Sequence, residues 1–160
     1  MSTSTVNEAM KGELLKVELR RVIRASRQRV FEAWTRPEEL RKWFGPAAMH
    51  VAELDMDARA GGSYRIVMQG ARDGNPAEAE RRASAMGEYT AIVPGELLAF
   101  TWRPDWNQED ESLVTIRFRD VEGGTEVHLI HERIASQSSC GGYQQGWTSC
   151  LDKLDQYLGK

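Results

Sequence analysis

The segment YQQGWTSCLDKLDQYL (143–158) decides the fold of this chain. Its apolar residues return at the spacing of one face of an α-helix: Tyr143, Trp147, Cys150, Leu151, Leu154 and Leu158. Lys153 falls on the opposite, polar face together with its charged and amide neighbours. We therefore expect one continuous helix over residues 138–158 that buries this apolar stripe, with Lys153 exposed.

The chain before this helix carries the period-two alternation and the turn residues of β-strands. Seven strands are predicted, at residues 15–24, 51–58, 64–68, 86–93, 97–103, 112–119 and 125–133. Two short helices are predicted after the first strand, one capped by Ser26 and one with Pro37 in its first turn. The charged stretch 70–84 is predicted to be a loop. Strands do not alternate with long helices, so the pattern indicates an α+β fold and excludes parallel doubly wound folds. The final helix can then bury its stripe only against the concave face of an antiparallel sheet.

The composition is that of one ordinary globular domain. The chain has 160 residues, with 41% hydrophobic and 28% charged residues and a formal net charge of -3. We expect a flexible tail over residues 1–12 and a single domain over 13–160. The weakly acidic balance favours neither nucleic acid nor an anionic membrane as a partner. The longest apolar runs are far shorter than a membrane span, and the first residues lack the apolar core of a signal peptide, so a cytoplasmic location is expected.

Neither the cysteines nor the histidines predict a metal site. Cys140 and Cys150 would lie ~15 Å apart along one helix, too far for a disulfide, so we expect two separate reduced thiols. His128 and His131 are three apart on one predicted strand, so their side chains leave on opposite faces and cannot share an ion. No metal, no cofactor and no catalytic residue is predicted.

Five motifs, taken together, carry a family resemblance. They are TRPEELRKWFGP (35–46), GGSY (61–64), GEYTAIVPGELLAFTW (87–102), VTIRFRDVEGGTEVHLIHE (114–132) and GWTSCLDKLDQYL (146–158). With these motifs in this order, the chain resembles the family named for the activator of heat-shock protein 90 ATPase, in the START-like (SRPBCC) superfamily. The resemblance implies a helix-grip fold: a seven-stranded antiparallel sheet wrapped around a long C-terminal helix, with a cavity between them. Tyr143 stands where many relatives carry histidine.

The aromatic side chains predict a pocket on the inner face of the sheet. Bulky aromatics between a curved sheet and a helix are typical of a cavity for an apolar ligand, although they can also simply fill the core. The residues expected to line this cavity are Tyr64, Met68, Trp102, His131, Tyr143 and Trp147. His131 is either a hydrogen-bonding group for the ligand or a core histidine satisfied by a neighbour.

The function that this arrangement favours is binding of a small hydrophobic ligand. Two alternatives stay open from the sequence. The first is an enzyme resembling polyketide cyclases and aromatases, which would need acid–base groups in the cavity. The second is a co-chaperone or stress-response accessory protein that acts through its surface, with a chaperone partner. A homodimer is also compatible with the sequence.

Overall fold

The computed structural model describes residues 15–46, 49–70, 82–105 and 111–159. The elements in chain order are β1 (Leu15–Ile23), α2 (Arg27–Thr35), α3 (Pro37–Trp43), β2 (His50–Met56), β3 (Ser63–Gln69), β4 (Arg82–Val93), β5 (Leu97–Pro104), β6 (Ser112–Val121), β7 (Gly124–Ile134) and α5 (Gln137–Leu158). The tail expected over residues 1–12 lies outside the described residues. The α+β class, the seven strands and the position of the three helices are confirmed.

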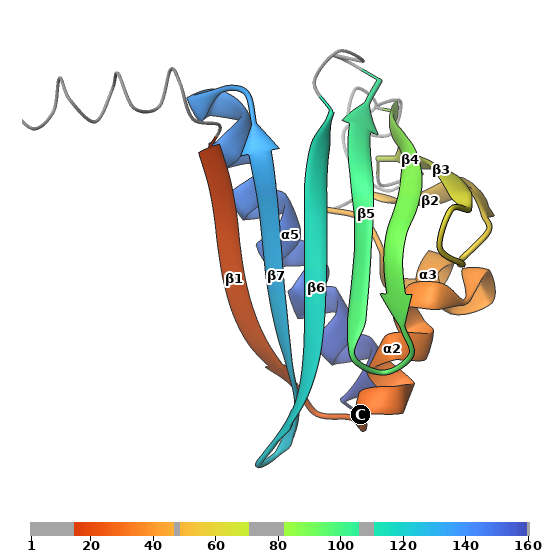
Figure 1. The fold of residues 1–160 in the computed structure, drawn as a ribbon, viewed down its shortest axis with the longest axis vertical. Coiled ribbons are helices and arrows are strands. Elements are labelled where there is room, and N and C mark those ends of the chain that lie inside the picture. The colour runs from red at the N-terminus through yellow and green to blue at the C-terminus, as the bar shows by residue number, and fades with distance from the viewer. Residues whose placement is uncertain (1–14, 47–48, 71–81, 106–110, 160) are drawn as a thin grey trace, which may run out of the picture.

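All seven strands form one antiparallel sheet in the order β1-β7-β6-β5-β4-β3-β2. Figure 1 shows α5 running across the rear face of this sheet, with α2 and α3 at the lower right, near the lower ends of β4 and β5. The strands after β2 follow one another as hairpins, whereas β1 crosses to the far edge and pairs with β7, where Val17 lies opposite His131. Because side chains alternate along each strand, one face of the sheet is apolar and faces α5.

Two glycines let β7 return against β6. Gly123 and Gly124 both have positive φ, 92° and 147°, a conformation that residues with a Cβ rarely adopt. A Cβ on Gly124 would lie 2.1 Å from the carbonyl oxygen of Ile23, so glycine is also required by the close approach of the chain at the end of β1.

The loop predicted over residues 70–84 is shorter than expected. β4 begins at Arg82, which pairs with Gln69, so residues 82–84 belong to the sheet. The prediction was wrong there because the charged residues of this stretch do not show the apolar alternation that identifies the start of a strand. Residues 71–81 lie outside the described part of the chain.

The two short helices form where the sequence places them. Ser26 caps α2 by accepting a hydrogen bond from the Arg29 amide, and Pro37 occupies the first turn of α3. The indole N–H of Trp43 donates to the Ala33 carbonyl at 3.1 Å, which fixes α3 against α2.

The helix α5 buries the stripe read from its sequence. Trp147, Cys150, Leu151 and Leu154 are buried, and Leu158 is half-buried near the end. Lys153 was predicted to be exposed, and this was wrong. Its ammonium group donates to the carbonyls of Gly45 (2.7 Å) and Met49 (2.8 Å), so the long side chain is drawn along the protein surface to backbone acceptors beyond α3.

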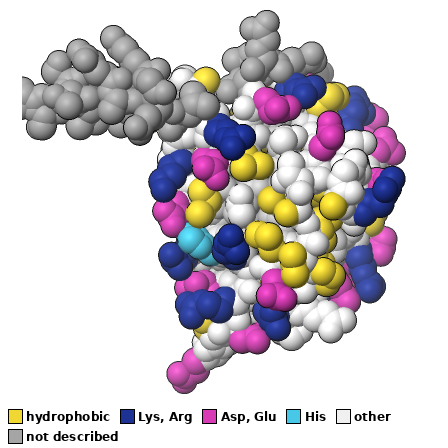
Figure 2. Space-filling model, in the orientation of Figure 1, with side chains coloured by type: hydrophobic (Ala, Val, Ile, Leu, Met, Phe, Trp, Pro, Cys, Tyr) yellow, Lys and Arg dark blue, Asp and Glu magenta, His cyan; other side chains and the backbone are white. Residues whose placement is uncertain are grey.

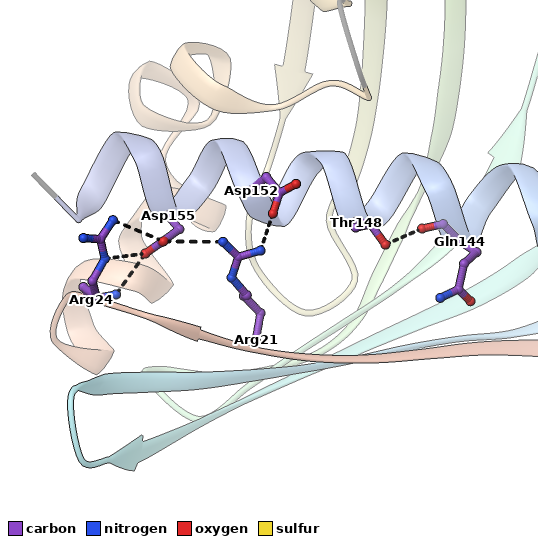
Figure 3. A network of polar contacts seen from close by, with 6 residues as sticks. All are labelled: Arg21, Arg24, Gln144, Thr148, Asp152 and Asp155. Atoms are coloured by element: carbon purple, nitrogen blue, oxygen red, sulfur yellow. Dashed lines mark hydrogen bonds and ion pairs between the residues drawn. The ribbon is translucent and has the colours of Figure 1, made fainter.

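Charged side chains join the C-terminal half of α5 to the end of β1, as Figure 3 shows. Arg21 pairs with Asp152 and Asp155, and Arg24 donates to Asp155 from its backbone N–H at 3.2 Å and from its guanidinium. The Asp155 side chain is mostly buried, whereas the two arginines that pair with it are partly exposed, so several individually weak contacts together join the helix to the sheet edge.

Figure 2 shows the outer face of the sheet, opposite α5. Acidic and basic side chains are intermixed around its margin, and hydrophobic side chains lie between them. Neither sign of charge forms a continuous patch in this view.

Both cysteines are free, Cys150 buried and Cys140 half-buried, as the helical spacing predicts.

Candidate functional site

A pocket of about 460 Å³ lies between the N-terminal half of α5 and the sheet. Its lining comes from α5, from β3, β4 and β5, and from the chain around the end of α3: Phe44, Pro46, Met49, Met68, Ala83, Trp102, Ser138, Ser139, Gly142, Tyr143, Gly146, Trp147 and Cys150. None of these described lining residues is charged. The pocket therefore offers a mostly apolar surface with a few hydroxyl and backbone groups, which is the usual chemistry of a site for a small organic molecule.

The structure brings four of the six expected site residues together at this pocket. Met68, Trp102, Tyr143 and Trp147 all line it. Tyr64 does not; it faces a separate void deeper in the domain, and its hydroxyl donates to the Thr101 carbonyl at 2.6 Å.

His131 is the second expected residue that does not reach the pocket. It is 0% exposed and lies behind Trp147, which donates its indole N–H to Nδ1 of the imidazole at 3.0 Å. The other ring nitrogen, Nε2, lies 2.6 Å from the Ser112 hydroxyl, and that hydroxyl donates to the Trp102 carbonyl at 3.2 Å. The ring therefore acts as a buried connector between α5 and β6.

These contacts fix the protonation state of His131. Since Nδ1 accepts from Trp147, the proton must sit on Nε2, and the ring donates to Ser112. Burial lowers the pKa of His131 to about 3, so the imidazole is neutral at physiological pH. With both nitrogens occupied inside the protein, His131 positions Trp147 in the pocket wall and presents no free polar atom to a ligand.

Aromatic contacts make this wall stiff. The ring centroid of Trp147 lies 5.6 Å from that of Trp102 and 5.9 Å from that of Phe44, both in edge-on geometry. Tyr143 lies against the His131 ring with centroids 4.3 Å apart. Such edge-to-face arrangements add stability beyond the area they bury, so the wall is held in one arrangement.

A smaller void of about 30 Å³ lies deeper, beside the pocket. Its lining is Trp34, Leu40, Phe44, Leu54, Tyr64, Ile66, Tyr89, Leu98, Phe100 and Trp102. Phe44 and Trp102 belong to both linings, so the two spaces adjoin at these side chains. Neither Trp34 nor Trp102 has a hydrogen-bond partner for its buried indole N–H among the described residues.

Sequence reasoning missed several lining residues. Phe44, Pro46 and Met49 come from the chain beyond α3, which carries no periodic signal. Gly142 and Gly146 come from the helix, where a Cβ on Gly142 would meet open space and one on Gly146 would meet only Pro46 at 3.4 Å. The signal available in the sequence was the presence of these two glycines within the stretch predicted to be a helix.

Cys150 lies in the pocket lining as a protonated thiol. Complete burial raises the pKa of its thiol to about 12, so the thiolate needed for reaction is scarcely populated at neutral pH.

Within the described ranges, no three His, Cys, Asp or Glu side chains come close enough to hold a metal ion. No helix in the described part of the chain is long and apolar enough to cross a membrane.

The sheet order, the long C-terminal helix and the pocket between them define a helix-grip protein of the START-like superfamily. Within that class, the chain belongs to the family described as Activator of Hsp90 ATPase homolog 1-like protein, whose model matches residues 24–159. The comparison with curated proteins gives no match.

Solved structures with the same fold come from several bacteria. A protein of Chromobacterium violaceum superposes with a TM-score of 0.73 at 26% identity, covering 91% of this chain and 99% of that chain. The AHSA1 protein of Silicibacter pomeroyi gives a TM-score of 0.76 at 23% identity, covering 91% and 98%. An AHSA1-like protein of Aeromonas hydrophila, solved by NMR, gives 0.71 at 22% identity, covering 91% and 92%.

Proposed function

We propose that this protein binds a small hydrophobic molecule in the pocket between α5 and the sheet. The observation that carries the proposal is the pocket itself: about 460 Å³, lined by aromatic, methionine and small side chains, with no charge among the described lining residues. Pockets of a few hundred cubic ångströms bury most of the surface of a small organic ligand. Two tryptophans in the wall add large apolar contact area at little cost in conformational entropy.

One wall of the proposed binding site is held in place by contacts within the protein. Trp147 is held by its hydrogen bond to His131, so the aromatic wall is formed before any ligand arrives. Preorganisation of this kind strengthens binding because little ordering remains to be done. Since His131 uses both nitrogens within the protein, the proposal includes no acid–base step and describes a binding protein.

A matched pair of variants on β4 tests this proposal with N-phenyl-1-naphthylamine, a neutral fluorescent probe. Ala83 lines the pocket, and Ala91 on the same strand does not. Wild-type protein and Ala91→Phe are expected to enhance probe emission with saturation, and Ala83→Phe to lose it because the new ring fills the space. Native mass spectrometry of the wild-type protein then looks for a molecule retained through purification. Absence of saturable binding by wild type, or equal binding by Ala83→Phe, would contradict the proposal.

A further inference from the structure

Of the four tryptophans that the structure describes, two donate their indole N–H in a hydrogen bond and two have a buried indole N–H without a partner among the described residues. The indole N–H of Trp43 donates to Ala33, and that of Trp147 donates to His131. Trp34 is 3% exposed and Trp102 is 5% exposed, yet neither N–H has a partner among the described residues. Buried N–H groups in native proteins are nearly always paired, so an unpaired one calls for a partner that the described residues do not supply.

Both unpaired donors belong to side chains that line the same inner void. Trp34 comes from α2 and Trp102 from β5, and the void of about 30 Å³ lies between these elements. That volume exceeds the ~10–15 Å³ that one water molecule requires, but it is far too small for a ring. Because Trp102 and Phe44 also line the outer pocket, the body of a ligand in that pocket would lie directly against the void.

The chemistry of the void selects the group that fits it. An indole N–H donates and cannot accept, so the missing partner must be a hydrogen-bond acceptor. A carbonyl oxygen has two acceptor positions and no hydrogen of its own, whereas a water molecule brings two hydrogens that need acceptors in turn. The described residues lining the void and the pocket carry no positive charge that would compensate a buried carboxylate.

We propose that the ligand of this pocket is a neutral apolar molecule with a carbonyl oxygen, which enters the inner void and accepts hydrogen bonds from Trp102 and Trp34. This inference rests on the proposed function and narrows it to a class of ligand. The apolar body occupies the outer pocket beside Trp147, and the carbonyl is the group that sets orientation.

Two probes of the same shape separate the carbonyl from simple apolar burial. These are 2-acetylnaphthalene and 2-isopropenylnaphthalene, in which a methylene group replaces the oxygen. The hydrocarbon is the more hydrophobic of the two, so apolar burial alone favours it. We expect the ketone to bind about five- to tenfold more tightly, as a net hydrogen bond to an otherwise unsatisfied donor predicts. Sodium 2-naphthoate is expected to bind more weakly than the ketone because its charge has no partner.

Single substitutions then locate the donor. Trp102→Phe and Trp34→Phe keep an aromatic ring and remove the N–H, and each is expected to reduce the preference for the ketone by severalfold. Trp43→Phe is the matched control because its N–H is already bound to Ala33, and it is expected to keep the wild-type preference. If a variant does not fold, the indole ¹H–¹⁵N signals of wild-type protein give the same information. The ketone should move the signals of Trp34 and Trp102 downfield, and the hydrocarbon should not.

The possible results separate the two proposals. Binding of both naphthalenes with no preference for the ketone overturns the carbonyl inference and leaves the hydrophobic site standing. Failure of both to bind contradicts the proposed function and this inference with it. A bound water detected by nuclear Overhauser effects at either indole N–H, and still present when the ketone is bound, would also overturn the inference.

Discussion

The buried imidazole of His131 is expected to make the stability of the domain depend on pH. Its pKa is lowered by burial to about 3 in the folded protein, whereas an exposed histidine has a pKa of 6.5. Between these values the unfolded chain binds a proton that the native protein does not, so the free energy of unfolding falls as the pH falls. Protonation of Nδ1 in the folded state would also set two donors against each other, because Trp147 already donates to that atom.

The magnitude follows from the two pKa values. Each pH unit between them changes the free energy of unfolding by about 1.4 kcal/mol, so lowering the pH from 7.0 to 4.5 costs about 2.5 kcal/mol through His131 alone. Carboxylates titrate over part of the same range, so wild type must be compared with a variant that lacks only this group. His131→Asn is suitable because its amide oxygen can take the place of Nδ1 as the acceptor for Trp147.

Urea unfolding followed by far-UV circular dichroism at the two pH values measures the difference. Wild type should lose about 2.5 kcal/mol more than His131→Asn between pH 7.0 and 4.5. Imidazole ¹⁵N signals of the wild-type protein should report the neutral Nε2–H tautomer throughout. If both proteins lose the same stability, or if the ring titrates near pH 6.5 in the folded protein, the buried hydrogen-bonded arrangement described above is incorrect.

Three further substitutions test the packing of the helix and of the sheet by chemical denaturation. Trp147→Ala should lower the free energy of unfolding by ~3–5 kcal/mol, because it removes a large buried aromatic from the wall; a nearly unchanged unfolding midpoint would mean that the helix stripe does not face the sheet. Gly142→Ala should raise it by ~0.5–1 kcal/mol, since the new methyl group meets open space and alanine favours the helix; a loss of stability would contradict the open pocket wall. Gly87→Ala should lower it by ~1–3 kcal/mol, because its Cβ would lie 2.0 Å from the Thr101 carbonyl oxygen; full retention of stability would show that β4 and β5 are farther apart there.

The parts of this fold that depend on local periodicity could be predicted from the sequence. The stripe from Tyr143 to Leu158 and the alternation around Tyr64, Ile66 and Met68 both depend on side chains repeating at the period of their own element, and both were predicted correctly. Lys153 was misplaced because its partners, two carbonyls beyond α3, are distant in sequence and leave no pattern.

The candidate site was harder to predict for the same reason. Tyr64 lies on the inner face as expected, but only the three-dimensional arrangement shows that it borders a different void from Met68. For His131, alternation along β7 predicts the inner face and cannot say which partners its nitrogens find. The indole N–H groups of Trp34 and Trp102 are unpaired because no acceptor among the described residues lies within hydrogen-bond distance. No pattern in the sequence indicates this.

The position of β1 beside β7 has a consequence for how the protein is made. Val17 in β1 lies opposite His131 in β7, so the sheet pairs residues that are more than a hundred positions apart in the sequence. The ribosome therefore releases one of them well before the other. β1 therefore stays without its partner strand until β7 has emerged, and the apolar face of the sheet stays uncovered until α5 follows. Pairing between such distant segments makes folding slow, and exposed strand edges favour aggregation meanwhile. Emergence of β7 and α5, rather than of any one hairpin, is then the step at which this domain becomes stable.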